Sequence, residues 1–89
     1  MKIIWNTYAW EEYLSFQQDT KKLKKINDLI KSITRNGYKC IGKPEPLKEN
    51  LSGFWSVRID KCNRLVFTIE KDSIIIIQCG THYKNKEIC

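Results

Sequence analysis

The chain has 89 residues, which is enough for one domain with a shallow core and too few for two. A hydrophobic fraction of 42% and the three Trp, four Tyr and three Phe exclude a disordered chain. The formal net charge of +6 favours a polyanionic partner, either nucleic acid or an acidic membrane surface, without choosing between them. We expect a single domain over residues 1–89.

No stretch of the sequence has the pattern of a signal peptide or a membrane span. Trp5-Asn6-Thr7 interrupts the first apolar residues, and the longest aliphatic run, Ile74–Ile77, is far too short to cross a bilayer. We therefore expect a soluble, cytoplasmic protein without a membrane partner.

The four cysteines stand at positions 40, 62, 79 and 89 and form no C-x-x-C motif. Because the single histidine cannot complete a Cys₂His₂ set, we expect no zinc site, and no other metal or cofactor. The scatter of the cysteines favours free thiols in a reducing compartment, although their even number leaves a disulfide open.

The first expected elements are a short strand over Lys2–Asn6 and a helix that Asn6 or Thr7 can cap. The pattern of this helix predicts one mostly apolar side and one outward polar side. Trp10, Tyr13, Leu14 and Gln17 share the first side, whereas Glu11, Glu12 and Gln18 are mostly outward.

A second helix is expected from Asp19-Thr20 to Asn36-Gly37, where glycine permits a left-handed cap. Its apolar positions have the 3-4-3 spacing of a stripe that faces the core. Four lysines between them form either a solvated face or a patch that follows the phosphates of a large RNA. The apolar positions are Leu23, Ile26, Ile30 and Ile33, and the lysines are Lys21, Lys22, Lys24 and Lys25.

From Leu47 onward the sequence has the pattern of β-strands. The expected strands are Leu47–Lys48, Phe54–Ile59, Arg64–Glu70 and Ser73–Cys79, with the last hairpin turn at Lys71-Asp72. This order predicts an α+β fold in which two helices pack on one face of a small, mostly antiparallel sheet. The four consecutive isoleucines of the last strand leave its inward side unassigned.

Two strands of the expected meander carry an arginine each. Trp55, Val57 and Ile59 alternate with Phe54, Ser56 and Arg58 in the first strand. In the second strand Leu65, Phe67 and Ile69 alternate with Arg64, Val66 and Thr68. If both apolar sets share a face, Arg58 lies opposite Arg64, or one diagonal step away, on the other face. Because like charges opposite each other destabilise a sheet, the pair suggests that an anion belongs between them. Two solvated arginines on an open face are the alternative.

The segment before these strands holds a carboxylate on a stiff loop. Glu45 lies between Pro44 and Pro46, which restrict the backbone to extended conformations. The loop then runs through Lys48 to a turn at residues 50–53, where Gly53 tolerates positive φ.

The only histidine, His82, follows the last strand and precedes Tyr83. Because that strand is expected to run antiparallel to Arg64–Glu70, its end should lie near Arg64 and Arg58. A lone histidine of this kind is otherwise typical of the protein surface. A basic face flanked by Glu, His and Tyr permits cleavage of RNA without a metal.

In such a reaction a base removes the proton of the 2′-hydroxyl, the alkoxide attacks phosphorus, and an acid protonates the leaving 5′-oxygen. Cations stabilise the negative charge that accumulates on the phosphorane. Glu45 is the candidate base and His82 the candidate acid. Arg58, Arg64 and Lys48 are candidates to hold the phosphate, and Tyr83 is a candidate to orient the substrate or stack on a base.

Four motifs resemble the YoeB/Txe toxins of the RelE superfamily: K-I-I-W…W-E-E-Y, G-K-P-E-P-L-K-x-N-L-x-G-x-W-S-x-R-I, N-R-L-V and the pair H-Y. The likeness spans Lys2–Tyr83. It implies a microbial RNase-type fold and a toxin that cleaves mRNA in the A site of the 70S ribosome. It also implies a Phd/YefM-type antitoxin, repression of the shared operon through operator DNA bound by the complex, and a possible homodimer.

The resemblance carries over to six positions of this chain. It implies a catalytic set of Glu45, His82 and Arg64 and a substrate-binding set of Lys48, Arg58 and Tyr83. Val57 replaces a second basic residue before the arginine, and residues 79–81 replace a more basic approach to His-Tyr. These departures bear on RNA contacts or codon preference and remove no catalytic group. The tail Lys84–Cys89 has no expected function.

Two other classes of function stay open at this point. One is a non-catalytic RNA- or ribosome-binding module that blocks translation by occlusion. The other is a structural partner that has lost toxicity and supports DNA binding by the antitoxin. New 5′-hydroxyl ends in mRNA distinguish cleavage from occlusion, and operator binding without an effect on growth indicates the last class.

Overall fold

The computed structural model describes residues 1–81, which form two α-helices and a five-stranded sheet. The expectations for His82, Tyr83 and the tail lie outside these residues. In chain order the elements are β1 (Lys2–Trp5), α1 (Thr7–Ser15), α2 (Thr20–Asn36), the 3₁₀ turn η1 (Gly37–Lys39), β2 (Glu45–Pro46), the 3₁₀ turn η2 (Glu49–Leu51), β3 (Trp55–Arg58), β4 (Arg64–Glu70) and β5 (Ser73–Gly80).

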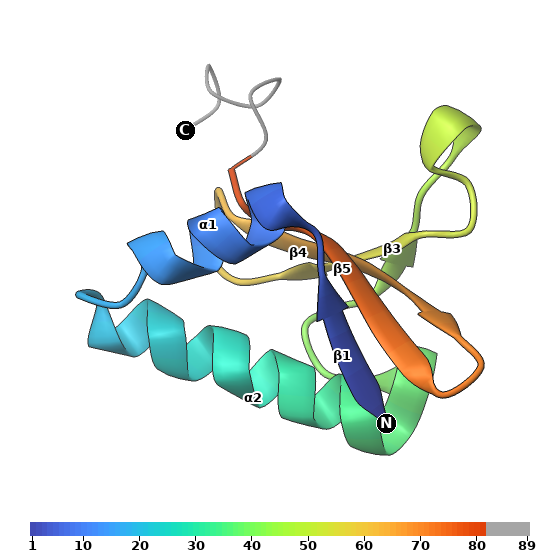
Figure 1. Ribbon diagram of the computed structural model, residues 1–89, viewed down its shortest axis with the longest axis horizontal. Helices are drawn as coiled ribbons and strands as arrows, with labels where there is room; N and C mark the ends of the chain where they lie inside the picture. The colour runs from blue at the N-terminus through green and yellow to red at the C-terminus, as the bar shows by residue number, and fades with distance from the viewer. Residues whose placement is uncertain (82–89) are drawn as a thin grey trace.

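The strands are ordered β1-β5-β4-β3-β2 across the sheet. β1 runs parallel to β5, and the other neighbouring strands are antiparallel. Figure 1 shows α1 and α2 together on one side of the sheet, with the green and yellow segment between α2 and β3 on its far edge. The expected α+β architecture, with two helices packed on a mostly antiparallel sheet, is confirmed.

Both helices begin at the caps that the sequence predicts. The Asn6 side chain accepts a hydrogen bond from the Ala9 N–H at 2.7 Å, and the Asp19 side chain accepts one from the Lys22 N–H at 3.2 Å. These bonds satisfy backbone donors that the first turn of a helix leaves unpaired. Helix α2 ends at Asn36. Its cap Gly37 has φ 61° and ψ −133°, which glycine tolerates but which differs from the expected left-handed conformation.

The stripe expected on α2 forms the helical half of the core. Ile26, Ile30 and Ile33 are buried, and Leu29 joins them from the next position of the same face. They pack against the inward residues of the sheet, of which Val57, Leu65, Phe67, Ile74 and Ile76 are fully buried. Within residues 1–81, no helix combines the length and apolar composition that crossing a bilayer requires.

The expected apolar side of α1 is confirmed for Tyr13, which packs against the core, and is wrong for Trp10 and Leu14. Ala9 is the buried residue of this helix, whereas Trp10 and Leu14 are 43% and 45% exposed. Glu12, which we expected to point outward, is half-buried against the end of β5. The small Ala9 side chain lets the helix approach the sheet, so size outweighs hydrophobicity here. Trp10 instead contacts Trp5, with ring centroids 5.7 Å apart.

Strand β5 lies inside the sheet, between β1 and β4, and a bulge interrupts its pairing with β4. Ile74 and Ile76 face the core, but the pairing with β4 then shifts between Val66 and Phe67. Phe67 pairs with Ile76 and Val66 with Gln78, so Ile77 is the additional residue. The bulge returns Cys79 to the core and sets Gly80 opposite Arg64.

Two smaller expectations also need correction. The short strand expected at Leu47–Lys48 lies instead at Glu45–Pro46, because the prolines hold that segment extended beside β3. Cys40 and Cys79 are buried free thiols as expected, but Cys62 is disulfide-bonded, so the expectation of free thiols is wrong there.

Two glycines of positive φ provide a test of packing at the edge of the core. A Cβ on Gly42 (φ 93°) would approach Leu29 Cδ2 to 2.6 Å and Val57 Cβ to 3.1 Å, whereas one on Gly53 (φ 96°) would meet nothing within 4 Å. We expect Gly53→Ala to lower the free energy of unfolding by about 1 kcal/mol through backbone strain alone. Gly42→Ala adds overpacking to this strain and should lower the free energy of unfolding by about 3 kcal/mol. Equal losses in urea denaturation would contradict the packing described for Gly42.

Candidate functional site

The two arginines expected to face each other are direct partners in the sheet. Arg58, the last residue of β3, pairs with Arg64, the first residue of β4. Arg58 is exposed and Arg64 is half-buried. Directly opposed residues of an antiparallel pair lie about 4.5–5.5 Å apart at Cβ, so the two side chains leave neighbouring positions on one face of the sheet. The position of the pair is therefore as predicted, and its role stays a prediction.

Glu45 lies beside this pair on the same face of the sheet. Glu45 pairs with Ser56, and Ser56 is two residues before Arg58 on the same strand. Residues two apart on a strand point to the same face, so Glu45 is a diagonal neighbour of Arg58. Diagonal neighbours are about 7–8 Å apart, within the combined reach of a Glu and an Arg side chain. The exposed carboxylate and the arginine pair thus belong to one surface.

The end of β5 completes the same edge of the sheet. Gly80 pairs with Arg64, as expected for the antiparallel order. His82 stands two residues further along the sequence, outside the described residues, as does Tyr83. Whether His82 meets Glu45 across the arginine pair therefore stays a prediction.

Lys48 is the one described candidate that the backbone does not bring to the pair. The Leu47 N–H donates to the Phe54 carbonyl at 2.9 Å, so Leu47 lies beside the beginning of β3, whereas Arg58 is at its end. Phe54 and Arg58 are four residues apart, which is about 13 Å along an extended strand. Lys48 follows on an exposed loop before η2. Its role in holding the phosphate stays a prediction.

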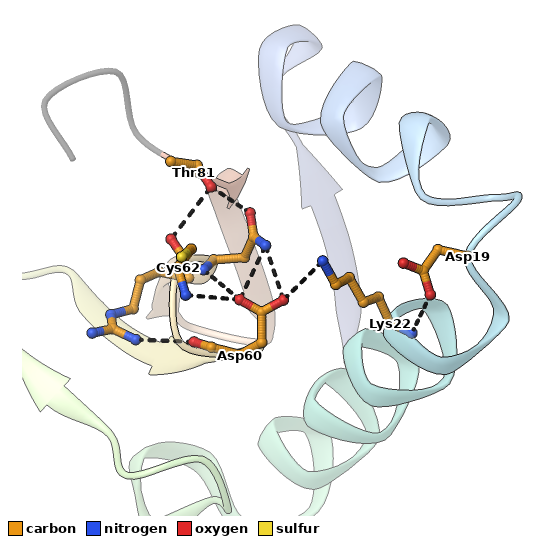
Figure 2. A network of polar contacts seen from close by, with 7 residues as sticks. Asp19, Lys22, Asp60, Cys62 and Thr81 are labelled. Carbon is orange, nitrogen blue, oxygen red and sulfur yellow. Dashed lines mark hydrogen bonds and ion pairs between the residues drawn. The ribbon is translucent and has the colours of Figure 1, made fainter. Parts of the chain in front are cut away.

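A network of polar contacts fixes the turn between the two arginines, and the sequence did not reveal it. Asp60 Oδ1 accepts hydrogen bonds from the Cys62 and Asn63 N–H groups, both at 2.8 Å. The Asn63 side-chain amide donates to both carboxylate oxygens of Asp60, at 3.1 and 3.0 Å. Lys22 reaches across from α2 and places Nζ 3.2 Å from Asp60 Oδ2 (Figure 2). The turn before Arg64 is thereby held to α2.

The same network holds the last described residue. Thr81 Oγ1 donates to Asn63 Oδ1 at 2.6 Å and lies 3.3 Å from the Cys62 carbonyl (Figure 2). Thr81 thus ties the end of β5 to the turn that carries Arg64. The aspartate at the start of the turn Asp60–Asn63 is a sequence signal for side-chain capping of that turn. The contact with Thr81, 18 residues away, had no local signal.

Glu12 fixes the other edge of β5. Pairing between β1 and β5 ends at Trp5 and Ile76, so the Cys79 N–H has no partner in β1. Glu12 Oε1 accepts this N–H at 2.9 Å and replaces the missing strand. A Cβ at position 80 would come within 2.6 Å of Glu12 Oε2, so Gly80 leaves room for the carboxylate. The acidic side chain was assigned to solvent because its partner is 67 residues away.

The surroundings of β5 leave its cysteine unreactive. Burial, together with the negative charge of Glu12, raises the pKa of the Cys79 thiol to about 12. The thiol therefore stays protonated near neutral pH and is no nucleophile there. Within residues 1–81, no three His, Cys, Asp or Glu side chains gather into a group that could hold a metal ion.

Substitution of Glu12 separates its hydrogen bond from its charge. Burial raises the pKa of the Glu12 carboxyl above 4.5, opposed by the hydrogen bond from Cys79. Ionisation then costs more in the folded than in the unfolded state, so stability falls as pH rises from about 4.5 through the raised pKa. We expect Glu12→Gln to lose this pH dependence and to be at least as stable as the parent at pH 7. We expect Glu12→Ala to lower the free energy of unfolding by about 1–3 kcal/mol, because the Cys79 N–H loses its acceptor.

Urea denaturation of the parent and both Glu12 variants between acidic and neutral pH makes this comparison. If Glu12→Gln were as destabilised as Glu12→Ala at pH 7, the carboxylate charge and not the acceptor would hold the strand.

The Asp60 network gives a second prediction with the opposite pH dependence. Burial opposes ionisation of Asp60, but bonds from Asn63, the Cys62 and Asn63 N–H groups and Lys22 lower its pKa to about 2. Its contribution is therefore complete above about pH 3.8 and is lost as pH falls toward 2. We expect Asp60→Ala to lower the free energy of unfolding by about 2 kcal/mol at neutral pH.

Lys22→Ala is the matched comparison, because the side chains of this ion pair are 40% and 30% exposed. We expect Lys22→Ala to lower the free energy of unfolding by less than about 1 kcal/mol. Equal losses for the two variants, or an Asp60→Ala difference that persists unchanged at pH 2, would show that the hydrogen bonds within the turn are not the main contribution.

Comparison with known proteins places this geometry in a family. The family described as "YoeB-like toxin of bacterial type II toxin-antitoxin system" matches residues 5–83. Toxin YoeB of Synechocystis sp. is 54% identical over 85 residues, which cover 94% of this chain and 99% of that protein.

Two solved structures from Staphylococcus aureus have the same fold. The YoeB dimer is 49% identical with a TM-score of 0.85, and YoeB in its complex with YefM is 48% identical with a TM-score of 0.87. Each match covers 93% of this chain and 98% of the other. The chain belongs to the YoeB-like toxins of bacterial type II toxin–antitoxin systems.

Proposed function

We propose that this toxin is an endoribonuclease that cleaves mRNA in the A site of the ribosome and so inhibits translation. The observation that carries the proposal is the direct pairing of Arg58 with Arg64 beside Glu45. Two guanidinium groups at one place repel each other unless an anion lies between them. A phosphodiester is such an anion, and its two non-bridging oxygens suit the guanidinium fork.

The neighbouring carboxylate, Glu45, is the general base at this phosphate site. Glu45 takes the proton of the 2′-hydroxyl, and the resulting alkoxide attacks phosphorus and displaces the 5′-oxygen. Arg58 and Arg64 stabilise the charge that builds up on the non-bridging oxygens. The reaction leaves a 2′,3′-cyclic phosphate on one fragment and a 5′-hydroxyl on the other.

The acid that protonates the leaving oxygen is assigned to His82 from the sequence resemblance. Support from the described residues is indirect: Thr81, its neighbour in sequence, is bonded to Asn63, and Asn63 immediately precedes Arg64. Tyr83 is assigned to orient the substrate, and Lys48 to contact RNA further along the strand.

The antitoxin is proposed by analogy with a relative. YoeB of Staphylococcus aureus is found in complex with YefM, and also as a dimer. We expect this chain to bind a Phd/YefM-type antitoxin, which neutralises it, and to act with that antitoxin as a corepressor at operator DNA. The formal net charge of +6 favours a negatively charged antitoxin segment.

Induction of the chain without an antitoxin tests the enzymatic claim directly. We expect arrest of growth and new 5′-hydroxyl ends within codons of translated mRNA, mapped by primer extension. Arg64→Ala should lower cleavage by about 10²-fold or more, because it removes a cation that stabilises the transition state. Arg35→Ala is the matched control, since it removes an exposed arginine at the far end of α2 and should cleave like the parent.

Two outcomes would overturn parts of this proposal. Arrest of translation without new mRNA ends would indicate occlusion instead of cleavage. Full toxicity of the double variant Glu45→Ala/His82→Ala, with the fold intact by circular dichroism, would show that the acid–base assignment is wrong.

A further inference from the structure

A second basic site adjoins the arginine pair at the end of β3. An open hollow of about 330 Å³ lies between α2, the loop after it and β3. Three separate segments contribute one basic residue each to its lining: Lys25 from α2, Lys43 from the loop and Arg58 from β3. Gly42, Ile59 and Asp60 complete the wall. Arg58 thus belongs both to this hollow and to the proposed catalytic surface.

The backbone holds Lys43 at the hollow against its conformational preference. Lys43 has a φ of 55°, in the left-handed region that is unfavourable for residues other than glycine. Gly42 before it fits closely beneath Leu29 and Val57, and its carbonyl accepts the Arg58 N–H at 2.9 Å. The loop is therefore fixed to β3 next to Arg58. A strained residue that the surroundings hold in place is a reason to look for a function.

The charges of the hollow are not neutralised by the fold. Of the α2 lysines, Lys22 pairs with Asp60 and Lys24 with Asp28, at 3.2 and 2.9 Å. Among the described residues, none of the three cations that line the hollow forms an ion pair. The carboxylate in the wall, Asp60, already accepts bonds from Lys22, Asn63 and two backbone N–H groups. It is therefore unavailable to compensate the three cations.

We propose that this hollow binds a phosphate of single-stranded RNA next to the phosphate held between Arg58 and Arg64. The inference rests on the proposed function, because it treats Arg58 as shared between two consecutive anions of one polymer. An RNA strand presents such anions at regular spacing, and compact lysine ammonium groups suit phosphate contacts. The hollow would then set the direction in which RNA leaves the scissile position.

Equilibrium binding of a non-cleavable 2′-O-methyl RNA oligonucleotide, measured by fluorescence anisotropy over a series of salt concentrations, tests the proposal. Each phosphate contact contributes about 0.7 to the slope of log affinity against log salt for a single strand. We expect Lys25→Gln and Lys43→Gln each to reduce the slope by about 0.7, and the double variant by about 1.4. Lys21→Gln is the matched control on α2 and should leave the slope nearly unchanged.

Lys43→Gly separates binding from folding. Glycine relieves the strain of the positive φ, so the urea midpoint should stay level or rise while RNA affinity falls. A purely structural lysine would not change these two quantities in opposite directions. If Lys25→Gln and Lys43→Gln changed the slope no more than Lys21→Gln, the proposal would be wrong.

The assay also separates this site from the proposed reaction, since binding needs no cleavage. Altered slopes without new mRNA ends would support the phosphate site and contradict the endoribonuclease. Normal cleavage with unaltered slopes would contradict the phosphate site alone. Unaltered RNA binding combined with weaker binding of a short polyglutamate peptide would assign the hollow to an acidic protein segment and overturn the proposal.

Discussion

The pairing of β3 with β4 sets Arg58 directly opposite Arg64, and the rest of the proposed site is arranged around this pair of like-charged residues. The apolar residues of the two strands fix the pairing, because a slip by one residue would turn Val57, Leu65 and Phe67 out of the core. Burial of the core therefore holds two like charges together. In the function that we propose, this pair binds a phosphate, and Glu45 on the neighbouring strand is the base beside it.

The end of β5 is held from both sides, although its contacts are few. Glu12 of α1 binds the Cys79 N–H on the outer edge, and Thr81 binds Asn63 on the side of the arginine pair. Asp60 connects that turn to Lys22 of α2. Both helices thus act on the strand that leads to His82. A small domain has a small hydrophobic core, so polar contacts between distant segments position the end of β5 here.

The sequence predicted features that depend on neighbouring residues or on strict alternation. The caps at Asn6 and Asp19 follow from a side chain three residues before its donor, and the opposition of Arg58 and Arg64 follows from the period of a strand. Predictions from the sequence were wrong where the outcome depends on contacts between distant segments. Glu12 was assigned to solvent and Ala9 was overlooked, because the inward side of α1 depends on how closely a helix approaches the sheet.

The arginine pair itself offers the most direct measurement. A protein with ¹⁵N-labelled arginine side chains can be titrated with a 2′-O-methyl RNA that it cannot cleave, and the Nε–H signals followed by NMR. Our account predicts that the Arg58 and Arg64 signals shift together with one dissociation constant, since a single phosphate contacts both guanidinium groups. RNA binding that shifts neither signal, or only that of the more exposed Arg58, would contradict it.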